Sequence, residues 1–141
     1  SNETSVALRY NAPSLRQWLI QAIYASRYPD GPTWLKPGYV IAERTYPLSA
    51  DNPRVHVEMD FADCVVAADP NNADYFYRTV PGSAEESEAV QALTPSLGPC
   101  LPKGLRFQLS PAVLKVWLGE GLWHASSNSV PAPAEASPAA H

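Results

Sequence analysis

Residues 60–101 read DFADCVVAADPNNADYFYRTVPGSAEESEAVQALTPSLGPCL and contain three successive signals for the start of a helix. Asp60 and Asp69 can each accept hydrogen bonds from the free amides of a following helix, and the proline after Asp69 fits the first helical position. Ser83 begins a capping box, with a glutamate three residues later. Apolar residues recur at helical spacing after each signal. The stretch therefore predicts three short helices, at residues 61–68, 70–79 and 84–94, the last one closed by Thr94-Pro95.

The only two cysteines, Cys64 and Cys100, lie near the two ends of this stretch. Helices this short do not persist alone in water, so the three must pack together, and a Cys64–Cys100 disulfide would join the first to the end of the third. Closing a loop of roughly 37 residues would add about 4 kcal/mol by the chain-entropy estimate. The alternative is two unpaired cysteines in the core, as in many cytosolic proteins. The even count favours the disulfide, and the lack of a CxxC pair argues against a metal site.

Length and composition predict one domain, spanning residues 1–126. The helix start signals and the helical spacing predict that it is mainly α, a compact bundle of about five short helices. The chain has 141 residues, 45% of them hydrophobic, which is enough to bury a core. A net charge of −4 argues against nucleic acid as a partner. No apolar run is long enough to span a membrane, and no cofactor motif is present. Residues 127–141 are rich in Ala, Pro and Ser, so we expect a disordered tail.

Two further helices are predicted outside the central stretch, at residues 13–26 and 111–125, where Pro13 and Ser110-Pro111 provide start signals. These two regions resemble each other, and we expect residues 105–125 to repeat residues 8–26 as a degenerate internal repeat. The first helix has an apolar stripe that we expect to face the core. Its members are Leu15, Trp18, Leu19, Ala22 and Ile23.

The segments DFADCVV, PGSAEESEAVQALTPSLGPCLPKG and LRFQLSPAVLKVWLGEGLW together resemble a family of uncharacterised exported proteins of alphaproteobacteria. The likeness covers about residues 60–125, and the basic residue that the family has in its closing helix is matched by Lys115. The resemblance implies a helical fold and export but no chemistry. We therefore expect a periplasmic or secreted protein, and we expect that a signal peptide once preceded the N-terminal Ser-Asn. Gly119 and Gly121 are unusual in a helix and indicate a close helix contact.

The predicted binding surface is a long loop, residues 27–54, that combines aromatic residues with prolines. Tyr28, Trp34, Tyr39 and Tyr46 have amphipathic side chains that favour contacts with a protein, peptide or glycan partner. Alternatively, these side chains cover the core. A non-catalytic binding module is thus the first functional hypothesis, and nothing in the sequence indicates its oligomeric state.

A small hydrolytic or metal-dependent enzyme is the second hypothesis. His56, Glu58 and Asp60 alternate with apolar residues, and in an extended strand the three would share one face. The alternative is a solvated face that leads into a helix cap. Glu120 and His124 are four residues apart in the last predicted helix, but the rest of an HExxH motif is missing.

Overall fold

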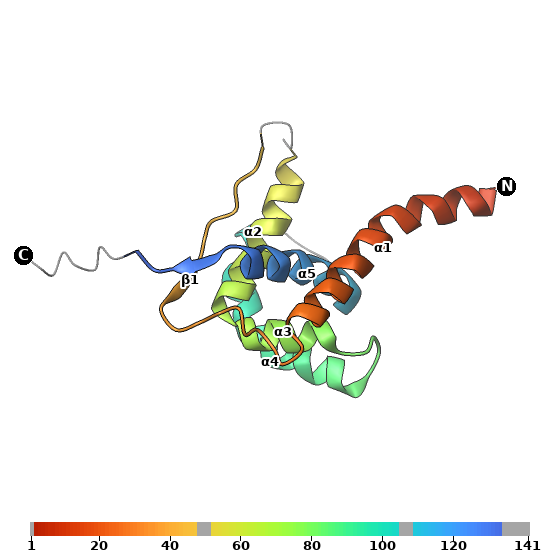
Figure 1. The fold of residues 1–141 in the computed structure, drawn as a ribbon. Helices are drawn as coiled ribbons and strands as arrows, with labels where there is room; N and C mark the ends of the chain where they lie inside the picture. The colour runs from red at the N-terminus through yellow and green to blue at the C-terminus, as the bar shows by residue number, and fades with distance from the viewer. Residues whose placement is uncertain (1, 48–51, 105–108, 134–141) are drawn as a thin grey trace, which may run out of the picture.

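The fold is a mainly α-helical bundle, as the sequence predicts (Figure 1). It also contains one small two-stranded sheet, which the sequence analysis did not predict. In this computed structural model residues 2–47, 52–104 and 109–133 are described, with only the helical backbone described for residues 2–14. Among these residues the elements are α1 (Asn2–Arg27), β1 (Tyr39–Ile41), α2 (Pro53–Ala68), α3 (Pro70–Arg78), α4 (Ala84–Cys100), α5 (Pro111–Ser127) and β2 (Ser129–Pro131).

Three of the predicted helix caps are confirmed. The Asp69 carboxylate accepts a hydrogen bond from the amide of Asn72 at 3.3 Å, at the start of α3. The Ser83 hydroxyl accepts from the amide of Glu86 at 3.1 Å, at the start of α4. Ser110 caps α5 in the same way. Each cap satisfies an amide that has no partner within the helix, which fixes where the helix begins.

The predicted start of α2, with Asp60 as its cap, is wrong, because the helix begins at Pro53 and not at residue 61. Asn52 caps it by accepting hydrogen bonds from the amides of Arg54 and Val55, at 3.1 and 3.4 Å. Proline at the first helical position loses no hydrogen bond there. The alternating segment that includes His56 and Glu58 is therefore helical, not extended.

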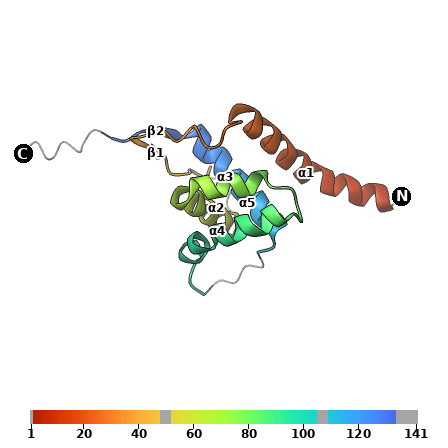
Figure 2. The ribbon, with the colours of Figure 1, turned by 90° about the horizontal axis from the view of Figure 1, so that it is seen from below.

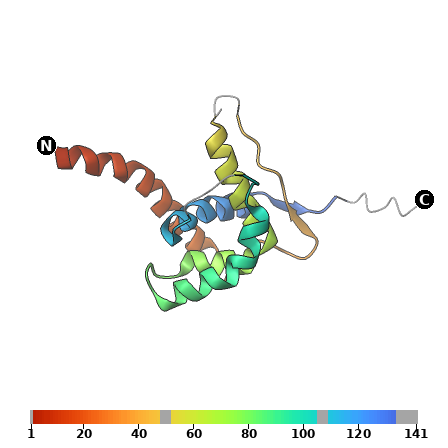
Figure 3. The same ribbon diagram turned by 180° about the vertical axis from the view of Figure 1, so that it is seen from behind.

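The predicted end of α4 at Thr94-Pro95 is also wrong. The helix includes Pro95 and Pro99 and ends at Cys100, and it changes direction between its bright green first part and its teal last part (Figure 3). Each proline removes one backbone donor and crowds the carbonyl four residues before it, which bends a helix. The bend directs the last turn of α4 toward α2.

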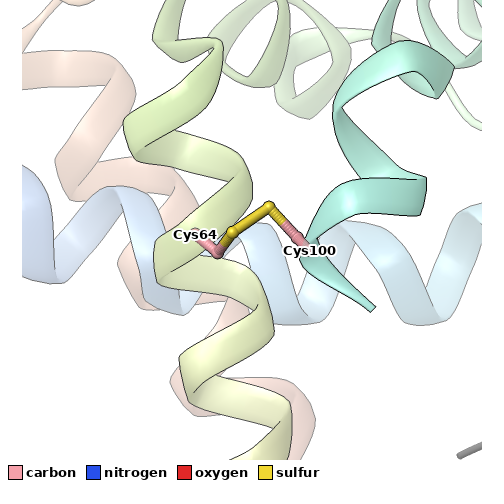
Figure 4. Close-up of a disulfide and its surroundings, with 2 residues drawn as sticks. All are labelled: Cys64 and Cys100. Atoms are coloured by element: carbon pink, nitrogen blue, oxygen red, sulfur yellow. A yellow bond between two sulfur atoms is a disulfide. The ribbon is translucent and has the colours of Figure 1, made fainter. Parts of the chain in front are cut away.

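The bend brings Cys100 beside α2, where it forms the predicted disulfide with Cys64 (Figure 4). The two Cα atoms are 5.7 Å apart, within the range that a disulfide allows. The bond joins residues that are 36 positions apart in the sequence. It therefore holds the first and last helices of the α2–α4 unit together.

The core lies where α2 and α3 pack against α5, with α4 packed on α2 and α3. Gly121 of α5 allows close packing against α2, because a Cβ atom at this position would lie 3.0 Å from Cγ2 of Val66 and 3.1 Å from the carbonyl oxygen of Ala62. The predicted close helix contact is thus present. The largest fully buried side chains are Tyr24, Phe61, Val65, Val66, Phe76, Leu93, Leu118 and Leu122.

Helix α1 contacts α5, but its apolar stripe does not face the core. Leu15 and Trp18 are 56% and 62% exposed, and Leu19 and Ile23 are also exposed. Ile20 and Tyr24, on the opposite side of the helix, are the buried residues. The predicted orientation is therefore wrong. The N-terminal part of α1 extends away from the other helices (Figures 1 and 2).

The internal repeat stays a prediction. Leu105-Arg106-Phe107, on which part of the match depends, lies outside the described residues. In the part that is described, matched residues have different environments, because Leu19 is exposed in α1 whereas its counterpart Leu118 is fully buried in α5. Among the described residues, these two helices therefore differ in which of their matched positions are buried.

The predicted disordered tail begins with ordered structure. Strand β2 pairs antiparallel with β1, so that Val130 lies opposite Val40, and the Ser129 hydroxyl donates to the carbonyl of Trp34 at 3.1 Å. The prediction is wrong for residues 127–133, because backbone pairing with the loop after α1 orders a segment that has no apolar face. Residues 134–141 lie outside the described residues.

Candidate binding pocket

The aromatic loop does not present Trp34 to a partner. Trp34 is 5% exposed, and its indole N–H donates to the Tyr24 hydroxyl at 2.9 Å. That hydroxyl in turn donates to the Asp74 carboxylate at 2.6 Å, and Arg78 binds the same carboxylate. Burial raises the pKa of the Tyr24 hydroxyl, and the hydrogen bond to Asp74 raises it further. The Tyr24 hydroxyl therefore stays protonated and continues to donate to Asp74. Trp34 thus closes over the core.

The other three predicted binding residues contact different parts of the fold. The Tyr28 ring packs against Tyr24, with 5.1 Å between the ring centroids. Tyr39 belongs to β1. The Tyr46 ring stacks on the His56 ring of α2, with 3.7 Å between the ring centroids. All three are partly buried. With Trp34 in the core, the four residues do not form the single aromatic surface that the sequence predicts.

The acidic residues near His56 are also separated. On a helix, residues two apart point in different directions, so Glu58 does not share a face with His56 and Asp60. Glu58 pairs instead with Arg54 at 3.1 Å, and Asp60 accepts a hydrogen bond from the Tyr46 hydroxyl. Within the described ranges, no three His, Cys, Asp or Glu side chains are arranged to hold a metal ion.

A pocket of about 300 Å³ lies between α1, α5 and the turn that joins α3 to α4. The exposed Trp18 and the buried Ile20 are on the α1 side, Val116 is on α5, and Pro81 is in the turn. The walls are mostly apolar, with a few polar groups. The polar lining residues are Gln17, Gln21, Tyr77, Thr79, Lys115 and Glu120.

Tyr77 places a hydroxyl at the pocket surface. Its side chain is only 6% exposed, and it lies on Gly119, where a Cβ atom would be 2.8 Å from the Tyr77 oxygen. This hydroxyl has no hydrogen-bond partner among the described residues, in which every fully enclosed side-chain N or O atom has one. The hydroxyl must therefore reach the open space of the pocket. Burial raises the pKa of Tyr77 to about 12, so it remains a donor at neutral pH.

Lys115 provides a second donor beside the pocket. Its ammonium group lies 2.6 Å from a Glu86 carboxylate oxygen and donates at 2.6 Å to the carbonyl of Thr79. An ammonium group has three N–H donors. Among the described residues the third has no oxygen acceptor, and the centroid of the Phe76 ring lies 5.4 Å from the ammonium nitrogen. Lys115 and Gly119 are four residues apart on α5, which places the Lys115 side chain on the same face as the Tyr77 hydroxyl.

The charged groups at the pocket are neutralised within the chain. Glu120 accepts two hydrogen bonds from Arg16, at 2.8 and 2.9 Å, and this pairing raises the pKa of the guanidinium. The bond from Lys115 is the main cause that lowers the pKa of Glu86. The two ion pairs therefore leave the pocket without net charge.

Comparisons with protein families, with curated proteins and with solved structures give no match. Within the described part of the chain, no helix is both long enough and apolar enough to cross a membrane. The function is therefore inferred from the pocket and the disulfide.

Sequence reasoning missed the pocket because its walls come from three distant segments. One signal was present: Lys115 and Gly119 stand four residues apart in a helix that is otherwise rich in large apolar residues. Gly119, which has no side chain, leaves space one helical turn from the charged group of Lys115. The residue that uses this space, Tyr77, lies on α3 and is not identifiable from the α5 sequence.

Proposed function

We propose that this protein is an exported, non-catalytic binding module that holds an apolar group of its ligand in the pocket between α1, α5 and the α3–α4 turn. The observation that carries the proposal is the pocket itself, with an exposed tryptophan, Trp18, beside a buried tyrosine whose hydroxyl has no partner in the described chain. Concave, mostly apolar sites with a few fixed polar groups are typical of ligand sites.

The lining favours binding over covalent chemistry. Nucleophilic catalysis by a hydroxyl needs a neighbouring base that removes its proton. The Thr79 hydroxyl instead donates to the carbonyl of Phe76 at 2.7 Å, and no histidine is among the lining residues. The Lys115 ammonium is held by Glu86 and by the carbonyl of Thr79, both at 2.6 Å.

The proposed location outside the cytoplasm is supported by the Cys64–Cys100 disulfide, because such bonds persist in oxidising compartments. Fractionation of the source cells tests it. We expect the protein in the envelope or the medium. Recovery of the protein in the cytoplasmic fraction, with both thiols reduced, would contradict export.

Binding in the pocket can be tested with a library of small aromatic and aliphatic fragments, followed by changes in amide NMR shifts. Val116→Trp should fill the pocket and abolish the shifts, whereas Val113→Trp, on the exposed side of the same helix, should leave them unchanged. Binding that persists in the Val116→Trp variant, or the absence of any binding fragment, would overturn the proposed site.

A further inference from the structure

We infer that the pocket selects an uncharged ligand group: an aromatic or branched apolar body joined to one carbonyl acceptor, which receives hydrogen bonds from the Tyr77 hydroxyl and from the third N–H of Lys115, the one that no oxygen of the described chain accepts. This inference rests on the proposed binding function and specifies its ligand. The same chemistry is present in a free aromatic ketone or amide and in a residue of a peptide.

The first step is the need of the Tyr77 hydroxyl for a partner. Buried tyrosines normally hydrogen-bond through the hydroxyl, and a side chain that is 94% buried has given up most of its contact with water. Tyr24, the other buried tyrosine on this side of the core, has two such partners, Asp74 and Trp34. The Tyr77 hydroxyl lines the pocket, so an acceptor on a ligand that enters the pocket can replace the water that otherwise hydrates this hydroxyl.

The second step is the polarity of that group. The Tyr77 hydroxyl can donate or accept, whereas the third N–H of Lys115 can only donate, so an acceptor is the kind of group that suits both. A carbonyl oxygen has two lone pairs and can accept both bonds. A ligand that offers only donors would leave the Lys115 N–H without a partner.

The third step is the charge of the group. The Lys115–Glu86 and Arg16–Glu120 pairs cancel at the pocket, so neither sign of charge gains a net attraction. A charged group would nevertheless lose its hydration on entering. A carboxylate would also lie near the carboxylates that hold Lys115 and Arg16. An uncharged carbonyl avoids both costs.

The fourth step is size. An apolar cavity of about 150 Å³ binds benzene. The present volume of about 300 Å³ therefore suits one aromatic ring with a short substituent. Trp18 and Val116 provide the apolar surface against which such a ring would pack.

The test uses NMR titration of the whole chain with four probes of matched size, which are ethylbenzene, acetophenone, benzoate and benzylammonium. A fifth and larger probe is N-acetylphenylalaninamide. We expect acetophenone to bind more tightly than ethylbenzene and than both ions. N-acetylphenylalaninamide shows whether a peptide residue fits, and tighter binding than acetophenone would identify a peptide as the source.

Two tyrosine variants on α3 make the result specific. Tyr77→Phe removes only the pocket hydroxyl and should weaken acetophenone about three- to ten-fold, with ethylbenzene unchanged. Tyr75→Phe removes an exposed hydroxyl outside this pocket and should change neither. Tighter binding of either ion, or equal loss of both neutral probes in Tyr77→Phe, would overturn the inference while leaving the binding function intact. If no probe binds, the proposed function fails as well.

Discussion

Gly121 lies where α5 packs against α2, and no larger residue fits there without movement of the backbone. The nearest atoms to a Cβ at this position include the carbonyl oxygen and carbon of Ala62, which cannot rotate away. Gly98 of α4 is a useful contrast, because a Cβ there would meet nothing within 4 Å. Alanine would therefore fit at Gly98 but not at Gly121.

We predict that Gly121→Ala lowers the free energy of unfolding by about 1–3 kcal/mol, because the two helices must separate to admit the methyl group. Gly98→Ala should raise it by up to about 1 kcal/mol, since alanine favours the helix and has room. Chemical denaturation of both variants measures the two changes. A stabilised Gly121→Ala variant would show that α2 and α5 are not in close contact.

At the scale of single residues, the sequence predicted those interactions whose two partners are close along the chain. The Asp69 and Ser83 caps were predictable because each bonds to an amide three residues away. The start of α2 was missed although Asn52-Pro53 gives the same kind of signal, because the alternation that follows also fits a strand. The true cap was thus hidden by a second pattern.

At the scale of an element, α1 shows what periodicity does not determine. Its spacing correctly identified an amphipathic helix, but the stripe of Leu15, Trp18 and Leu19 faces solvent. Which face is covered depends on neighbours that are distant in sequence. Here Tyr24 enters the core, because its hydroxyl finds Asp74 of α3 and Trp34 of the loop.

The predicted repeat supplies a matched pair for testing this orientation. Leu118→Ala in α5 should lower the free energy of unfolding by about 2–5 kcal/mol, because the side chain is fully buried. Leu19→Ala, at the matched position of α1, should change it by only about 0.5 kcal/mol, because that side chain is 43% exposed. Thermal or urea unfolding of both variants measures the difference. Similar losses in the two would mean that the stripe of α1 is buried.

At the scale of the whole molecule, the disulfide was predictable and the pocket was not. Cys64 and Cys100 are the only candidates for such a bond, and each lies near one end of a three-helix unit. The pocket depends instead on how α1, α3 and α5 approach one another. No local pattern specifies that arrangement.

Replacement of both cysteines by serine should lower the free energy of unfolding by about 2–4 kcal/mol. The disulfide joins residues that are 36 positions apart, and without it the unfolded chain regains conformational entropy. Reduction of the wild-type protein should have a similar effect and none on the variant. Denaturation with and without reductant measures both. Two reactive thiols in the oxidatively folded, denatured wild-type protein would exclude the bond.

The central claim is that ligands enter between α1, α5 and the α3–α4 turn, and nuclear Overhauser effects between bound acetophenone and the protein test it most directly. The account predicts contacts from the aromatic ring to the Val116 methyl groups and the Trp18 indole, and from the acetyl group to the Tyr77 ring. Contacts confined to other exposed residues, such as Val80 and Tyr75 beside the start of α4, would contradict it.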